Sequence, residues 1–344
     1  MKPEFIVGSE KRFAEFMGNL NEKDKIGILT HTDPDGICSA VIASKVLGKI
    51  DYLDFINYKH GIYAGIALEL KKKKINKILI FDLGLDDEKE DIKEMEKFAE
   101  ILVIDHHPFV FDLNSERTVF IKTASKYPAT AACYYLFSKI QKIPSWIAAM
   151  GIMGDLPQLY FKDNCSSVFS DFGLENGCDL WDSVEEVSLA LAYFEKDMKK
   201  IYDALMNAKN PFELGLKEYA DKVKEDYKKS LEDYIKNREV HGDLIVYLAK
   251  SNYPIKSLLA NKISSENQEK TIVFMIEYPD RISISARSQT VDCNKMMKLA
   301  VEGIPDAFAG GHKGATGGRV PVKYLPKFKK NLIRAYDNLK DKEK

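Results

Sequence analysis

Carboxylate and imidazole side chains gather in two short motifs of this sequence, "HTDPDG" at residues 31–36 and "DHHPF" at residues 105–109. Only six His occur in 344 residues, yet three of them lie in these motifs beside Asp. Such side chains are costly to desolvate unless they are paired or bind a metal ion. Because "DHHPF" follows the apolar run "ILVI", its polar residues stand at the end of a buried strand. The clustering indicates a functional site rather than an ordinary polar turn.

The first motif alternates His31, Asp33 and Asp35, so in an extended chain these side chains point into the same space. Pro34 stiffens the segment, and Gly36 permits a tight turn into the helix that follows. Carboxylates and an imidazole held together in this way would repel one another or titrate. A divalent cation resolves that conflict.

Three further segments add ligands of the same kind: Asp82 ends one apolar run, Asp105, His106 and His107 end the next, and Asp155 follows an apolar helix. Oxygen-rich ligation with some imidazole and no thiolate favours Mn²⁺ or Mg²⁺ over a structural zinc ion. The ligands suffice for two ions that share one carboxylate. Two ions about 3.5–4 Å apart form the usual clamp for hydrolysis of phosphate esters.

The elements that must position these residues alternate along the first 110 residues. Apolar strands are expected at 25–33, 52–60, 77–85 and 101–107, and amphipathic helices at 36–50, 65–74 and 86–100. Near-continuous apolar strands separated by helices predict a parallel sheet covered on both faces. Since ligands of such sheets lie outside the carboxyl ends of the strands, the fold brings the motifs to one edge.

The pattern of expected helices and strands is different in the rest of the chain. Residues 125–200 are largely helical in pattern, and residues 213–239 predict one long charged helix with a narrow apolar stripe. From residue 242 onward, strands and helices mix and end in the Gly-rich segment 309–320, expected to be a loop. The predicted fold class is α/β, with an N-terminal parallel-sheet domain joined by a long helix to a smaller α+β domain. The boundaries are 1–210, 211–240 and 241–344.

A second group of polar residues lies in the C-terminal part. Arg287 follows a strand in "SISARS", and "GGHKGATGG" places His312 and Lys313 within a stretch of five Gly. Backbone N–H groups of such a loop approach a phosphate closely, and Arg offers it a bidentate fork. The spacing matches neither a P-loop nor a Rossmann fingerprint, so this signal is weak by itself.

Composition excludes several classes of protein. The sequence is 45% hydrophobic and 30% charged, which is typical of a soluble globular protein, and its 51 basic and 52 acidic residues give a net charge of −1. Bulk charge therefore indicates neither a nucleic-acid nor a membrane partner. No apolar stretch is long enough to span a bilayer, and the first residues do not resemble a signal peptide. Five scattered Cys without a CxxC argue against disulfides and thiolate zinc sites, and we expect a cytoplasmic protein.

Taken in order, "HTDPDG", "FDLG", "DHH", "GD", "SARS" and "GGH" resemble the motifs of the DHH phosphoesterase superfamily. The C-terminal half is similar to the DHHA1 domain of that superfamily, and the resemblance covers most of the chain. The compact length is similar to that of archaeal RecJ-like nucleases, because there is no room for the additional oligonucleotide-binding fold of long bacterial RecJ exonucleases.

The resemblance implies a site with two divalent ions, Mn²⁺ in the first place and Mg²⁺ as the alternative, bridged by Asp82. One ion would be held by His31, Asp33 and Asp82, and the other by Asp35, Asp82, His106 and Asp155. His107 would lie beside the scissile phosphate as a general acid or hydrogen-bond donor, and Asp105 would orient an imidazole. Binding of a substrate phosphate or terminal nucleotide is assigned to Arg287, Gly310, Gly311 and His312.

Three functions follow from the resemblance. The favoured one is an exonuclease on single-stranded DNA or RNA, and the second is a phosphodiesterase restricted to short oligonucleotides or cyclic dinucleotides. The third is a non-catalytic scaffold associated with replication or repair proteins, which the complete ligand set disfavours. An inorganic pyrophosphatase is disfavoured because "GGH" belongs to a different C-terminal domain. A path for a long strand would need basic and aromatic residues, for which the candidates are Lys122, Lys126, Tyr127, Tyr253 and Lys256.

Overall fold

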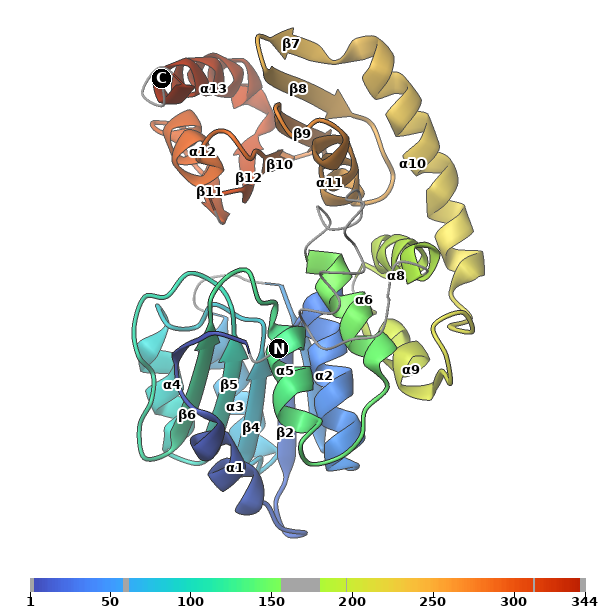
Figure 1. The fold of residues 1–344 in the computed structure, drawn as a ribbon. Coiled ribbons are helices and arrows are strands. Elements are labelled where there is room, and N and C mark those ends of the chain that lie inside the picture. Colours follow the sequence, from blue (N-terminus) through green and yellow to red (C-terminus); the bar gives the residue numbers. More distant parts are fainter. Residues whose placement is uncertain (1–2, 58–61, 156–179, 196, 312, 341–344) are drawn as a thin grey trace. The chain divides into compact units, whose positions relative to one another are not determined.

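The structure is a computed structural model that describes residues 3–57, 62–155, 180–195, 197–311 and 313–340. The chain divides into two compact units, Met1–Lys217 and Glu218–Lys344, and each is described by itself (Figure 1). Unit 1 is an α/β unit, and unit 2 combines helices with a second sheet, so the expected fold class is confirmed. No helix of the described ranges is long and apolar enough to cross a membrane.

The sheet of unit 1 has six strands in the order β1-β6-β5-β4-β2-β3. All neighbouring pairs are parallel except β1 with β6. Buried Ile, Leu, Val and Phe dominate the central strands, which is typical of a parallel sheet covered on both faces. The strands are β1 (Phe5–Val7), β2 (Ile26–His31), β3 (Tyr52–Ile56), β4 (Lys77–Phe81), β5 (Glu100–Asp105) and β6 (Thr118–Thr123).

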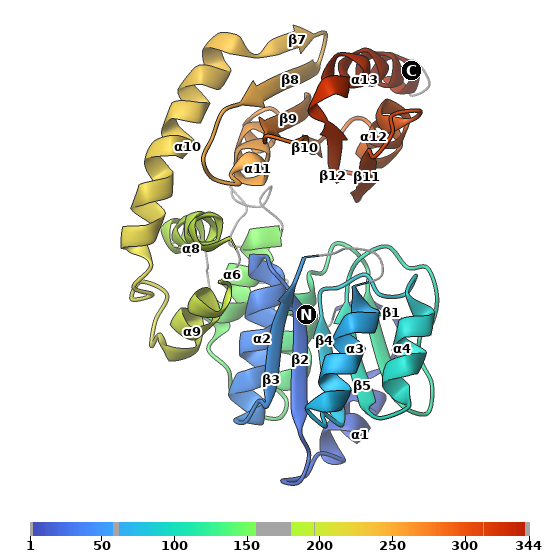
Figure 2. The same cartoon turned by 180° about the vertical axis from the view of Figure 1, so that it is seen from behind.

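Helices cover both faces of this sheet. On one face lie α3 (Tyr63–Lys72) and α4 (Lys89–Glu96), and on the other α1 (Glu10–Gly18), α2 (Pro34–Leu47) and α5 (Ala129–Phe137) (Figures 1 and 2). Next in sequence, α6 (Ser145–Asp155) packs against α2 and α5. The helices α8 (Trp181–Phe194) and α9 (Lys199–Asn207) complete the described part of unit 1.

Unit 2 begins with the long charged helix α10 (Lys217–Asn237), which was expected over 213–239. Its sheet has the order β11-β12-β10-β9-β8-β7 and is antiparallel except for β8 with β9. The strands are β7 (Glu239–His241), β8 (Leu244–Ala249), β9 (Thr271–Glu277), β10 (Arg281–Arg287), β11 (Phe308–Gly311) and β12 (Ala315–Pro321). The helices are α11 (Lys256–Glu266), α12 (Cys293–Val301), the short 3₁₀ helix η3 (Val322–Tyr324) and α13 (Leu325–Lys340).

Two parts of the sequence interpretation were wrong or incomplete. The Gly-rich segment 309–320 is mostly not a loop, because β11 and β12 run through it and pair in antiparallel register, with Gly310 opposite Gly317. Gly311 has φ +147, and a Cβ there would lie 2.6 Å from the carbonyl oxygen of Ala315, so a side chain is excluded by strain and by space. The strands β1, β6 and β7 were not predicted.

Close packing of α6 on α2 and α5 makes Gly151 a sensitive position. A Cβ there would lie 2.3 Å from Oγ1 of Thr130 and 2.9 Å from Cβ of Cys38. We expect Gly151→Ala to lower the free energy of unfolding by about 1–3 kcal/mol, the usual cost of overpacking. In the control Gly65→Ala, also within a helix, the new Cβ meets nothing within 4 Å, so stability should be unchanged or slightly higher. Urea unfolding of the two variants measures the difference, and equal stabilities would contradict this packing.

Candidate metal centre

The parallel strands of unit 1 bring the motif residues to one edge of the sheet. His31 is the last residue of β2, Asp105 is the last residue of β5, and Asp82 directly follows β4. The register pairs Thr30 with Phe81 and Phe81 with Ile104, so the three strands end at the same level. His106 and His107 therefore emerge from the edge at which His31 and Asp82 lie.

Helix ends orient the two Asp of the first motif. Asp33 caps α2 by accepting a hydrogen bond from the Gly36 N–H at 3.0 Å. The Asp35 side chain is fully buried and accepts hydrogen bonds from the backbone N–H groups of Ala129 and Thr130 at 2.8 and 2.7 Å. These donors belong to the first turn of α5, where the helix dipole favours a negative charge. The start of α5 thus fixes the Asp35 carboxylate.

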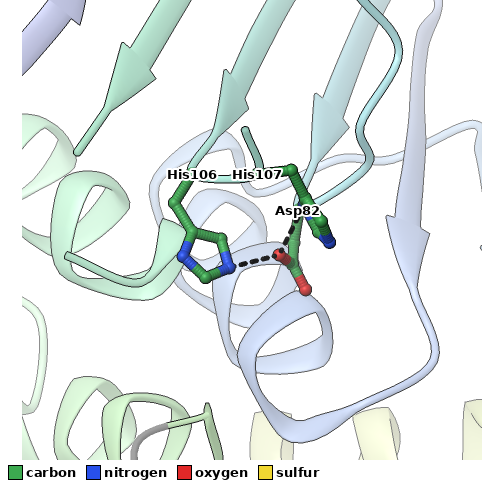
Figure 3. Close-up of side chains that lie close together, drawn as sticks. All are labelled: Asp82, His106 and His107. Atoms are coloured by element: carbon green, nitrogen blue, oxygen red, sulfur yellow. Dashed lines mark ion pairs between the residues drawn. The ribbon is translucent and has the colours of Figure 1, made fainter. Parts of the chain in front are cut away.

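Asp82 lies at the centre of the group. Its side chain is buried, and its backbone adopts a left-handed conformation with φ 57, which is uncommon for residues other than Gly. Oδ2 lies 3.2 Å from Nδ1 of His31, while Oδ1 lies 3.3 Å from Nε2 of His106 and 3.8 Å from Nδ1 of His107 (Figure 3). Within the described part of the chain, Oδ1 accepts no hydrogen bond although it is buried. A buried carboxylate oxygen without a hydrogen bond fits a metal ligand.

Three groups of side chains at this edge could each hold a metal ion, since in each group the ligand atoms lie within 4.8 Å of one another. The groups are His31, Asp33 and Asp82; Asp35, His106 and Asp155; and Asp82, His106 and His107. Asp82 and His106 each occur in two of them. Carboxylate and imidazole ligands so placed fit divalent ions such as Mn²⁺ or Mg²⁺.

Mutual repulsion and burial shift the titration of these carboxyl groups. Burial, with the charge of Asp82, raises the pKa of Asp35 well above its ordinary value and that of Asp155 to about 6. Burial would also raise the pKa of Asp82, but its contacts with His106 and His31 outweigh burial and lower it well below the usual range. The ionised form is thus favoured at Asp82 and the protonated form at Asp35, and a bound cation would displace such a proton.

The nearby carboxylates raise the pKa values of the imidazoles. Burial alone would lower the pKa of His31, but the carboxylates of Asp33 and Asp82 raise it well above the usual value. His106 behaves in the same way, through Asp155 and Asp82, and its Nδ1 lies 3.3 Å from the carbonyl oxygen of Ser125. That contact aims Nε2 toward the carboxylates.

A buried chain of charged groups supports His107. Nδ1 of His107 lies 2.7 Å from Oδ1 of Asp105, and the Lys122 ammonium contacts Oδ2 of Asp105 at 2.5 Å and Oδ1 of Asp86 at 2.9 Å. Asp86 also accepts the N–H of Val110 at 2.6 Å. The His107 contact and Lys122 help to lower the pKa of Asp105 despite its burial, and Asp105 in turn raises that of His107. The network orients the ring of His107.

The sequence analysis predicted that Lys122 lines a path for a long strand, and this prediction is wrong. Its side chain is fully buried, because Asp105 and Asp86 neutralise it inside the unit. Asp86 was missed as part of the site. The signal that could have found Lys122 is a Lys within the apolar run "VFIK", since a buried Lys requires a carboxylate partner. Lys126 and Tyr127 are the other residues of unit 1 that were predicted to line that path. Lys126 is exposed, pairs with Glu4 at 3.4 Å and lies 5.0 Å from the ring centre of Tyr127.

The residues expected to bind substrate phosphate lie in unit 2. Arg287 ends β10 and donates hydrogen bonds to Asn261 at 2.6 Å, to Ser285 at 3.1 Å and to the Ala286 carbonyl at 2.8 Å. Burial and the nearby Arg287 lower the pKa of Lys256 to about 8, so two cationic side chains are neighbours here. Gly310 and Gly311 lie in β11, Tyr253 is partly buried, and His312 lies outside the described residues.

Comparison with known proteins extends these findings. Residues 25–154 match the N-terminal domain of the DHH family, and residues 244–338 match the DHHA1 domain. No curated protein sequence matches the chain.

Several solved structures have the same fold. RecJ from Thermus thermophilus, in complex with Mn²⁺, is 14% identical, with a TM-score of 0.65 over 95% of this chain and 54% of that one. A pGpG-specific phosphodiesterase, PggH from Vibrio cholerae, is 14% identical, with a TM-score of 0.53 over 92% of this chain and 100% of that one. CDC45 from Entamoeba histolytica is 9% identical, with a TM-score of 0.61 over 95% of this chain and 98% of that one. The chain spans about half the length of the Thermus protein.

The buried network makes Lys122 a strong stability determinant. Lys122→Met removes the cation that Asp105 and Asp86 share and leaves the buried charge of both carboxylates less well compensated, so the free energy of unfolding should fall by about 3–5 kcal/mol. The control Lys126→Met removes an exposed pair with Glu4 and should change stability by less than about 0.5 kcal/mol. Urea unfolding of both variants measures this, and a Lys122→Met variant as stable as the wild type would refute the network.

Stability without metal should fall as the pH rises. The folded state raises the pKa values of His31, His106 and His107 above their ordinary value of 6.5, whereas the raised pKa of Asp155, about 6, acts mainly below pH 6. These protons stabilise the fold in full below the unfolded-state values, and that contribution is lost as the pH rises through the folded-state values. The melting temperature in EDTA should therefore fall by several degrees from pH 6 to pH 9.

Added Mn²⁺ should raise the melting temperature, and by more at pH 9 than at pH 6, because the ion binds the deprotonated ligands. A melting temperature in EDTA that rises over this range would show that the carboxylates and imidazoles are not coupled in the way described.

Proposed function

Because this chain belongs to the DHH and DHHA1 phosphoesterase superfamily, we propose that it is a metal-dependent phosphodiesterase, and specifically an exonuclease that releases nucleotides from single-stranded DNA or RNA. The observation that supports this most strongly is the placement of three candidate metal-binding groups around the buried Asp82. The likeness in fold to RecJ, an exonuclease crystallised with manganese, is consistent with that chemistry.

We propose two divalent ions, Mn²⁺ or Mg²⁺, with Asp82 as the shared ligand. His31 and Asp33 would complete one ion's ligands, and Asp35, His106 and Asp155 those of the other. When bound, such a pair activates a water molecule and stabilises the attacking and leaving oxygens of a phosphodiester. The chain's own part is to hold the ligands rigidly, through the cap of α2 and the first turn of α5.

We propose that His107 is the general acid. Asp105 contacts its Nδ1 and, against the opposing effect of burial, raises its pKa, which favours the protonated ring. We propose that this proton passes from Nε2 to the leaving oxygen, and that Asp105 and Lys122 keep the ring in position. In unit 2, Arg287 would bind a substrate phosphate through its planar fork, and Gly310, Gly311 and His312 would help to bind the same phosphate or terminal nucleotide.

A phosphodiesterase restricted to short substrates is the second candidate. It is favoured by the fold likeness to PggH, which covers the whole of that protein. A replication-associated scaffold, for which the CDC45 likeness is the argument, is disfavoured by the intact set of candidate ligands. Single-stranded nucleic acid or a short oligonucleotide is the partner we propose, and replication or repair proteins would be further partners.

A degradation time course in Mn²⁺ tests this function, with a long 5′-labelled single strand and a dinucleotide as substrates. Stepwise shortening of the long strand supports the exonuclease, whereas cleavage of the dinucleotide alone supports the short-substrate enzyme.

Asp82→Ala should reduce turnover by more than about 100-fold. Loss of a residue that only orients a metal ligand typically costs about 10- to 100-fold, and loss of the shared ligand itself should cost more. Asp87→Ala, at an exposed neighbouring carboxylate, is the control and should stay within about twofold of the wild type. Substantial turnover by Asp82→Ala would remove Asp82 as the shared ligand.

A further inference from the structure

The segment directly after the two His exposes three large apolar side chains in a row. Phe109, Val110 and Phe111 are 44%, 49% and 55% exposed, and Leu113 is the next apolar residue to be buried. A run of consecutive exposed apolar residues costs solubility and contributes nothing to the core, so it needs a functional reason. The side chain of Phe has no polar group that could form a hydrogen bond with solvent water.

The backbone of this segment is held in place. The Val110 N–H donates to Asp86 at 2.6 Å, and Asp86 pairs with the fully buried Lys122. Lys122 also pairs with Asp105, which contacts His107. One buried network therefore fixes both the ring proposed as the general acid and the centre of the exposed apolar run.

The distance between these two features is short. Phe109 is two residues beyond His107, so their Cα atoms are at most about 7 Å apart. Both Phe carry aromatic rings that are about half exposed, and stacking on aromatic residues is how proteins bind single-stranded nucleic acid without reading its sequence. A nucleotide whose phosphate lies beside His107 would bring its base to the start of this run.

We propose that Phe109 and Phe111 form a base-binding platform that stacks a nucleobase of the substrate next to the scissile phosphate. This inference rests on the proposed function and deepens it, since it names the residues that would bind a base of the nucleic-acid substrate. All four bases have an aromatic face, so the platform contributes affinity with little sequence preference.

Binding and turnover of a short single strand test the platform. Phe109→Ala and Phe111→Ala should each weaken binding by roughly five- to 100-fold, which is the range for loss of one base–aromatic stack. Affinity is measured by fluorescence anisotropy of a labelled oligonucleotide with Ca²⁺ in place of Mn²⁺, and KM and kcat are measured in Mn²⁺. Because stacking binds the base and not the phosphate, KM should rise more than kcat falls.

Two matched controls separate stacking from general apolar contact. Phe212→Ala removes a Phe of unit 1 that is 67% exposed and distant in sequence, and Val110→Ala truncates the non-aromatic member of the run. Both should bind the strand within about twofold of the wild type. A strand of equal length with abasic residues should bind wild type and Phe variants alike, since it offers the same phosphates without bases.

Unchanged affinity and KM in both Phe variants would overturn the platform, and so would an equal loss of affinity for the abasic strand. Failure of the proposed function would look different. A wild-type protein that binds the strand and does not cleave it would overturn the exonuclease, while weaker binding by the Phe variants would still support the platform.

Discussion

The burial of an ionised carboxylate at Asp82 is the constraint on which the rest of unit 1 depends. Inside a protein such a charge is stable only when cations or strong donors surround it. Here the three imidazoles of His31, His106 and His107 supply that surrounding, and they converge because β2, β4 and β5 are parallel and end at one level. The left-handed backbone of Asp82 is strained, and the packing of the surrounding sheet must compensate for that strain. Strained backbone conformations are common at functional sites.

Several residues of the candidate site are in turn held by groups outside it. The first turn of α5 orients Asp35, the carbonyl of Ser125 contacts His106, and the buried Lys122 fixes Asp105 behind His107. Sites of this kind work only when the ligands are preorganised, because a metal centre that must rearrange loses affinity and rate. The charged network also extends outward through Asp86 to the exposed aromatic run, so the proposed base platform and the proposed general acid share one support.

Much of this could be predicted from the sequence, because apolar strands followed by Asp and His specify both a parallel sheet and the edge at which ligands collect. The strand β6 was not predicted because Lys122 interrupts its apolar pattern. Asp86, the partner that allows Lys122 to be buried, lies 36 positions away in the sequence. The Gly-rich segment was taken for a loop because Gly usually marks turns. In β11 and β12 the Gly instead lets two strands approach closely, which only pairing across the sheet could reveal.

Whether Asp82 is shared by two divalent ions, as we propose, can be measured by titrating the metal-free protein with Mn²⁺ and following the electron paramagnetic resonance spectrum. We expect two Mn²⁺ to bind per chain and the signal of isolated ions to be lost as the second binds, because ions about 3.5–4 Å apart are magnetically coupled. Binding of a single Mn²⁺ with an undiminished isolated-ion spectrum at saturation would contradict it.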